Sequence, residues 1–352
     1  MSKVYFSKDV NHIEKLLDII EIDRIIKKSD LTALKIHFGE KGNTTYIKPD
    51  LIRPVINKVK KINAFPFLTD ANTIYTGSRS NAIEHLKIAS EHGFSYENLE
   101  CPVIIADGIL GNSYVEVDIL DNKQTKYFKK IKVSHSIYYS DSIIFLTHFK
   151  GHMAFGFGGV LKNIGMGCAP KTGKYELHNL CVPNMNISKC IECGLCVMKC
   201  PGNALILNKG KKIFIDKNKC IGCGECIVVC KQNVFKVPWD ETDKKLQEKT
   251  VEYVFGILRN KRYLCINFLI NITKDCDCTN REQKPLIEDI GILVSTDPVS
   301  IDQASVDLVN QKFKKDFFKH IFPEIDYNIQ LEYAQKIGIG QREYDLIKIS
   351  DQ

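Results

Sequence analysis

The chain has 352 residues, of which 44% are hydrophobic and 26% charged, the composition of an ordinary globular protein. The formal net charge is +7, but the basic residues are dispersed and form no long block or aromatic-interleaved stripe, so we expect no nucleic-acid partner. The longest apolar run, 263–270, is too short to span a bilayer, and the N-terminal residues lack a signal-type apolar stretch. We therefore expect a cytoplasmic protein without a membrane segment.

The first 150 residues alternate between helical and strand patterns. Apolar residues at helical spacing predict helices over 11–28, 49–62 and 81–92. Short apolar runs predict strands over 33–38, 65–68, 103–106 and 142–147. Strands that alternate with helices are typical of a mainly parallel sheet with helices on both faces. The expected fold class is therefore α/β.

The last third of the chain continues this pattern. Two further strands are predicted over 263–270 and 290–295, followed by a helix over 301–313. We expect these elements to complete the same sheet. The stretch between the two parts would then be an insertion, with domain boundaries at 1–180, 181–240 and 241–352.

The predicted insertion is rich in cysteine. Fourteen cysteines in a chain expected in the cytoplasm indicate metal binding rather than disulfides. Eight of them form two runs with the spacing Cys-x2-Cys-x2-Cys-x3-Cys, in which three thiolates hold one [4Fe–4S] cube and the fourth ligates the other. This places Cys190, Cys193, Cys196 and Cys230 on cluster one, and Cys220, Cys223, Cys226 and Cys200 on cluster two.

The doubled spacing predicts an α+β dicluster module of the bacterial ferredoxin type, with a small hairpin formed by 204–207 and 212–216. The alternative is a pair of zinc sites, which the repeated spacing disfavours. Binding of two clusters would remove about four of the positive charges. The remaining basic character suits docking of an acidic electron donor, and we expect a redox partner protein such as a ferredoxin or flavoprotein.

A second site is predicted where the strands end, because ligands bind beyond the carboxyl ends of strands in open parallel sheets. Metal-competent side chains stand at several of these ends. They are His37, His148, His152, Cys276 and Cys278. Aspartates flanking the two thiols disfavour free thiolates unless a cation offsets the charge. We predict an additional metal or redox site here, for zinc, iron or nickel. The alternative is unpaired loop cysteines and histidines bonded to the backbone.

The glycine-rich stretch 155–167 is a candidate anion site. Its backbone N–H groups could hold an anion or a cofactor phosphate together with a lysine. The residues that carry this prediction are Gly158, Gly159 and Lys162. The alternative is close packing of a loop. Near the C-terminus, Asp297 is predicted to cap the helix that follows it.

Several stretches together resemble a known family. They are 35–40, 147–152 with the glycine loop 162–167, 276–278, and 295–302, with the dicluster run between them. This combination resembles the uncharacterised iron–sulfur centre proteins of anaerobic bacteria and archaea known as domain of unknown function three-six-two. The resemblance implies an α/β domain with an inserted ferredoxin module, and it implies no reaction.

Three hypotheses for the function follow. The first is an oxidoreductase that passes electrons from two [4Fe–4S] clusters to a site in the α/β domain. The second is a ferredoxin-like electron carrier in which the α/β domain only docks partners. The third is a metal-cofactor maturation protein that uses the His and Cys residues. A pocket near a cluster favours the first, a filled α/β core favours the second, and a preformed third metal site favours the last.

Overall fold

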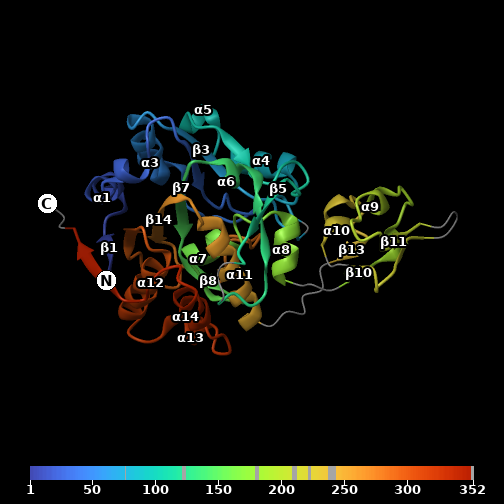
Figure 1. Cartoon of the computed structure of the whole chain (residues 1–352). Helices are drawn as coiled ribbons and strands as arrows, with labels where there is room; N and C mark the ends of the chain where they lie inside the picture. Colours follow the sequence, from blue (N-terminus) through green and yellow to red (C-terminus); the bar gives the residue numbers. More distant parts are fainter. Residues whose placement is uncertain are drawn as a thin grey trace.

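An eight-stranded sheet forms the centre of the chain (Figure 1). The structure is a computed structural model, which describes residues 1–75, 77–120, 124–178, 182–207, 212–220, 223–236 and 243–349. The strand order is β16-β1-β15-β14-β7-β2-β3-β4. Their bounds are β1 Ser2–Ser7, β2 Leu31–Lys35, β3 Phe65–Asp70, β4 Val103–Ile105, β7 Ser142–His148, β14 Arg262–Leu269, β15 Gly291–Ser295 and β16 Tyr344–Lys348.

The sheet is mainly parallel, as predicted. Strands β14, β7, β2, β3 and β4 run parallel to one another, and β16 runs parallel to β1. Only β15 runs antiparallel to both of its neighbours, β1 and β14. The patterns did not predict β1 and β16. The reason is visible in β16, an edge strand in which no residue is fully buried, so no apolar run marks it.

Helices cover both faces of the sheet, which confirms the α/β class (Figure 1). Successive side chains of a strand point to opposite faces. In β7, Ile143 and Phe145 therefore enter one core and Ile144 and Leu146 the other. The first core also receives α6 His135–Tyr139, α7 Val160–Gly165, α8 Lys171–His178, α11 Asp243–Leu258, α12 Pro298–Phe313, α13 Phe317–Ile321 and α14 Asn328–Lys336. The second receives α1 Ile13–Ile19, α2 Ile22–Ile25, α3 Pro49–Lys61, α4 Ala82–Glu91 and α5 Tyr96–Leu99.

One predicted helix differs in the structure, one predicted cap is confirmed, and some small elements are additional. The single helix expected over 11–28 is two short helices, because Glu21 between them takes a left-handed conformation with φ of 54°. Asp297 caps α12 as predicted, accepting hydrogen bonds from the amides of Val299 and Ser300. Small additions were not predicted: the hairpins β5 Tyr114–Asp118 with β6 Lys130–Ser134, and β8 Lys150–His152 with β9 Gly156–Gly158, and the 3-10 turns Val10–His12 and Ile187–Lys189.

No helix in the described part of the chain combines the length and apolar character needed to cross a membrane.

The cysteine-rich segment has a small core of its own, formed by residues such as Leu205, Ile215 and Phe235. Its elements are β10 Asn184–Met185, α9 Leu195–Met198, β11 Leu205–Ile206, β12 Phe214–Ile215, α10 Glu225–Val229 and β13 Phe235–Lys236. The predicted hairpin is confirmed, because β11 pairs antiparallel with β12. The internal repeat is visible too: α9 and α10 each follow a left-handed glycine, Gly194 and Gly224.

This segment leaves the sheet domain and returns to it at one place. Its first and last strands pair antiparallel, with Asn184 opposite Lys236. The sheet strands on either side of it in the sequence, β7 and β14, are direct parallel neighbours. In Figure 1 the segment projects beyond α8, away from the sheet. We propose that it is an inserted unit within 181–240; residues 181 and 237–240 lie outside the described residues.

The paired strands β10 and β13 suggest where the unit can be excised. Replacing residues 186–234 with Asn-Gly would join Met185 to Phe235 through a two-residue hairpin turn, the loop that best fits antiparallel strands. We expect a folded α/β protein with a cooperative unfolding transition and no bound iron, measured by circular dichroism and iron analysis. An aggregated product without native secondary structure would contradict the proposed boundaries.

Candidate functional site

A cavity of about 580 Å³ lies at the carboxyl ends of the parallel strands. Its lining includes Lys35 at the end of β2, Asp70 at the end of β3 and His148 at the end of β7. Cys276 and Cys278, in the loop after β14, form another wall. Parallel strands present their carboxyl ends at one edge of a sheet, so the loops that follow them enclose a common space.

All residues predicted for the second site and for the anion site line this cavity. They are His37, His148, His152, Cys276 and Cys278, and Gly158, Gly159 and Lys162. Lining one cavity does not make them ligands of one ion. Across the described ranges, no three His, Cys, Asp or Glu side chains are grouped so that they could hold a metal ion. Whether a metal binds here stays a prediction.

A buried carboxylate holds the Cys276–Cys278 loop against β7. The carboxylate of Asp277 lies 2.9 Å from the Nδ1 of His148 and forms an ion pair with the Nζ of Lys150 at 3.1 Å. The other ring nitrogen of His148 lies 2.9 Å from the carbonyl oxygen of Ile270. Both ring nitrogens of His148 therefore face hydrogen-bond acceptors. Burial opposes the charge of Asp277, but His148 and Lys150 outweigh it and keep the pKa of Asp277 well below its usual range.

This contact corrects two parts of the metal prediction. His148 offers no free ring nitrogen, because both are engaged by Asp277 and Ile270. The flanking aspartates also need no metal to offset their charge, since Asp275 pairs with Arg281 at 2.8 Å and Asp277 with its own two partners. The segment 276–279 is a turn, closed by a 3.0 Å hydrogen bond from the Thr279 amide to the Cys276 carbonyl.

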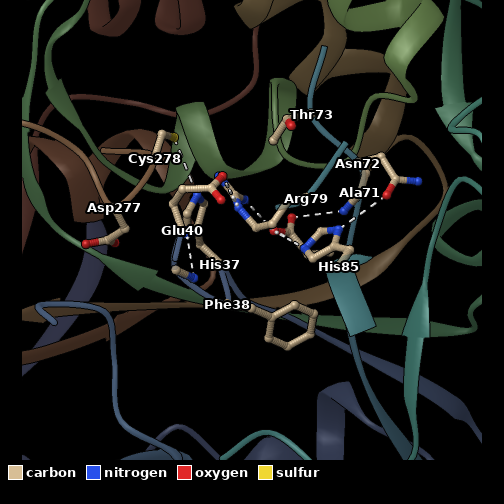
Figure 2. A network of polar contacts seen from close by, with 12 residues as sticks. His37, Phe38, Glu40, Ala71, Asn72, Thr73, Arg79, His85, Asp277 and Cys278 are labelled. Atoms are coloured by element: carbon tan, nitrogen blue, oxygen red, sulfur yellow. Dashed lines mark hydrogen bonds and ion pairs between the residues drawn. The ribbon is translucent and has the colours of Figure 1, made fainter. Parts of the chain in front are cut away.

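The thiolate of the site is Cys278, which lies 3.4 Å from the Nε2 of His37 (Figure 2). The Gly39 amide donates a 3.0 Å hydrogen bond to the other ring nitrogen of His37. The proton of a neutral His37 therefore sits on Nε2 and points at the sulfur. A hydrogen bond from the Cys276 thiol, helped by His37 and Lys162, outweighs burial and holds the pKa of Cys278 well below its usual range. The same hydrogen bond, together with burial, raises the pKa of Cys276.

A second wall is a buried ion-pair network around Asp70, of which Figure 2 shows Arg79 and Glu40. Lys35 pairs with Asp70 at 2.9 Å, and Arg79 pairs with Asp70 and with Glu40 at 3.3 Å each. Arg79 also donates a 2.5 Å hydrogen bond to the hydroxyl of Tyr75. Burial opposes the charge of Asp70, but Lys35 and the nearby histidines outweigh it and lower its pKa well below the usual range. The network joins the loops that follow β2 and β3.

The third wall carries uncharged imidazoles and a lysine. Burial, with the nearby charge of Lys162, holds the pKa of His152 well below its usual range. Burial lowers the pKa of His178 to about 3, and that of Lys174 to about 8. Lys162 has no carboxylate partner among the residues that the structure describes; its ammonium lies 5.7 Å from the centre of the Phe155 ring. It is the cation most available to a ligand.

The predicted anion site lies at the start of α7. The amides of Val160 and Leu161, which begin α7, already donate to the buried carboxylate of Asp302 at 2.8 and 2.9 Å. A side chain at Gly159 would place its Cβ 2.3 Å from that carboxylate, so the glycine is needed for this internal contact. These two amides are not free for a ligand. Gly158, Gly159 and Lys162 line the cavity, and their binding of an anion stays a prediction.

Sequence reasoning missed several lining residues. Tyr75 and Arg79 lie in an irregular loop with no pattern to mark them. Lys174 and His178 are four residues apart on α8, and therefore on one helix face, which was a usable signal. A second usable signal was a lysine inside an apolar strand, as at Lys35, because a buried lysine needs a carboxylate partner.

The cysteine-rich segment has a small cavity of its own, of about 20 Å³. Its lining includes the four cysteines predicted for cluster two: Cys200, Cys220, Cys223 and Cys226. Burial and the charge of Cys230 raise the pKa of Cys196 to about 11. Eight cysteines with this spacing are compatible with two [4Fe–4S] clusters, and which cysteine holds which cluster stays a prediction.

The fold and the two sites define an α/β protein that has a cavity at its strand ends and a cysteine-rich unit with a hydrophobic core of its own. The description "Domain of unknown function (DUF362)" matches residues 32–307, and the chain belongs to this family. No ferredoxin family matches the cysteine-rich stretch, and no curated protein matches the chain.

Two solved structures are distantly similar. One is the lactate racemase apoprotein from Thermoanaerobacterium thermosaccharolyticum, with 11% identity, a TM-score of 0.38, and coverage of 77% of this chain and 51% of that one. The other is a structural-genomics protein from Thermotoga maritima, with 12% identity, a TM-score of 0.37, and coverage of 93% and 59%. The chain thus matches little more than half the length of either protein.

The Asp277 contact predicts a large loss of stability on substitution. Asp277→Asn leaves His148 and Lys150 buried without their counter-charge, and we expect a loss of about 3–5 kcal/mol in the free energy of unfolding. Anaerobic chemical unfolding at neutral pH measures it. The matched control is Asp275→Asn, whose partner Arg281 is largely exposed and which should cost about 0–1 kcal/mol. Equal, small losses would contradict the proposed anchor.

Proposed function

We propose that the chain is an iron–sulfur oxidoreductase. Two [4Fe–4S] clusters accept single electrons from a redox partner protein and pass them to a substrate in the strand-end cavity. Cys190, Cys193, Cys196 and Cys230 would hold cluster one, and Cys220, Cys223, Cys226 and Cys200 cluster two. Bound clusters of this kind supply one-electron storage and transfer. The observation that carries the proposal is the packing of the cluster-two half against α8.

The contact with α8 is close. A side chain at Gly224 would place its Cβ 2.8 Å from the ring of Tyr175, so the loop of cluster two can approach α8 only as glycine. Beside it, Asn112 donates a 3.4 Å hydrogen bond to Glu225 at the start of α10. Lys174 and His178, on the same helix as Tyr175, line the large cavity. One helix therefore separates cluster two from the cavity.

This arrangement supports an order for the two clusters. In Figure 1, α10 faces α8, while α9 and β11 lie farther from the sheet domain. Cluster one, which takes most of its ligands from around α9, is then the outer cluster and the point where a ferredoxin-like or flavoprotein donor docks. Cluster two is the inner cluster and the one that serves the cavity.

The cavity also bears on the alternatives. An electron carrier with a docking domain was expected to have a filled α/β core, and an open space of about 580 Å³ favours an enzyme. A cofactor-maturation protein would use the same cavity residues, and metal analysis separates it from the oxidoreductase, because it would retain metal beyond that of two clusters.

The cluster content is the first test. Anaerobically purified protein should contain about eight irons and eight sulfides per chain, because each cube holds four of each. A low-potential ferredoxin should reduce it and give paramagnetic signals from two interacting centres. Zinc without sulfide, or clusters that a protein donor does not reduce, would contradict the proposal.

The crossing of the fourth ligand gives a sharper test. In a Cys220→Ser/Cys223→Ser background cluster two is lost, and about four irons should remain. Adding Cys200→Ala should remove no more iron, because its cluster is already gone. Adding Cys230→Ala instead should remove the rest, because Cys230 holds cluster one. Iron analysis measures both, and the reverse result would show that the fourth cysteines do not cross.

A further inference from the structure

The Cys276–Cys278 turn presents two thiols on one side. Asp277 between them is buried and fixed to His148 and Lys150, and in Figure 2 its carboxylate points away from Cys278 and His37. Both cysteines are half-buried, carry free thiols and line the cavity. The β-turn closed by Thr279 brings the two residues closer than an extended chain would.

The two sulfurs are not equivalent. Cys278 accepts from the Nε2–H of His37 at 3.4 Å and from the thiol of Cys276. His37 cannot turn its lone pair to the sulfur, because its other nitrogen accepts from the Gly39 amide. Cys278 is thus the nucleophile, and Cys276 is the neighbour that holds a proton.

We propose that Cys276 and Cys278 form a redox-active dithiol that reduces a small anionic disulfide bound in the cavity. This deepens the proposed function and rests on it for the supply of electrons. The dithiol chemistry itself needs only the two cysteines and His37.

The exchange proceeds in two steps. The Cys278 thiolate attacks one sulfur of the substrate disulfide, forms a mixed disulfide and releases the first substrate thiolate. Cys276 then attacks the Cys278 sulfur, its proton goes to the second substrate sulfur, and a Cys276–Cys278 disulfide remains. Two electrons and one proton restore the Cys276 thiol and the Cys278 thiolate. The donor protein supplies these electrons through the clusters, one from each.

The walls of the cavity define the class of substrate. Lys162 lines the same cavity as the two thiols, its charge helps to lower the pKa of Cys278, and it lacks an ion pair with any described carboxylate, so it can bind a negative group of the substrate. His152 and His178 are held uncharged and offer polar but neutral surface. The volume of about 580 Å³ suits a small molecule rather than a protein chain.

Trapping with an aromatic disulfide tests the dithiol. Under anaerobic conditions, the full chain should release two equivalents of the anionic thiol from 5,5′-dithiobis(2-nitrobenzoate) and end with a Cys276–Cys278 disulfide. Cys276→Ser should release one and keep the other as an adduct that mass spectrometry places on Cys278. Cys278→Ser should lose the fast phase. An adduct on Cys276, or one equivalent from the unsubstituted protein, would overturn the assignment.

Lys162→Met tests the charge of the substrate. It should slow the reaction with this anionic probe about tenfold or more, because a charge-assisted contact is lost. The reaction with neutral 2-hydroxyethyl disulfide should slow much less, because it loses only the contribution of Lys162 to the low pKa of Cys278. Equal slowing with both probes would contradict a role for Lys162 in binding the anion.

Electron counting separates this inference from the proposed function. After oxidation by the probe, the unsubstituted protein should take up about four electrons from a reduced ferredoxin, two for the clusters and two for the disulfide. The double variant Cys276→Ser/Cys278→Ser, which can form neither a disulfide nor a probe adduct at this turn, should take up about two. The cluster-two variant Cys220→Ser/Cys223→Ser should leave the disulfide oxidised. If trapping succeeds but only two electrons are taken up, the dithiol stands and the electron route fails. If trapping fails while both clusters are reduced, the dithiol fails and the clusters stand.

Discussion

The cavity depends on one buried carboxylate, Asp277, which is held by His148 and Lys150. It ties the irregular loop after β14 to the end of β7, two strands that are parallel neighbours but lie more than a hundred residues apart in sequence. A buried carboxylate is tolerable only with such partners, and breaking the set leaves charge in the interior. The contact therefore fixes the direction of the cysteines on either side, because Asp277 is turned inward and both thiols face the cavity.

The opposite wall is also held by buried ion pairs, which other residues form. Asp70 is held between Lys35 and Arg79, and Arg79 reaches on to Glu40. Two networks, one on each side of His37, make the strand ends rigid where loops would otherwise be mobile. Burial lowers the pKa of His37 and of His152, so these two imidazoles are neutral, and the thiols and Lys162 are the groups left to react or bind. Rigid walls around a few reactive groups are what a site needs in order to position a small substrate.

Much of this arrangement could be predicted from the sequence, and the parts that could not have a common cause. Buried strands such as β7 carry continuous apolar runs and were predicted, whereas the half-exposed edge strand β16 does not and was missed. The rule that strand ends converge correctly brought His37 and the two cysteines to one cavity. This rule could not predict which polar groups form hydrogen bonds and ion pairs with one another. Asp302 takes the amides that seemed free for an anion, and Arg79 comes from a loop without any pattern.

Under the proposed function, the close approach of Gly224 to Tyr175 would connect cluster binding to the position of the cysteine-rich unit. The left-handed turn at Gly224 belongs to the loop that carries the cysteines assigned to cluster two, and that same turn packs against α8. The strand-end cavity and its ion pairs lie in the sheet domain and are built without these cysteines. Insertion of the clusters would then be a late assembly step, in a scaffold that has already folded.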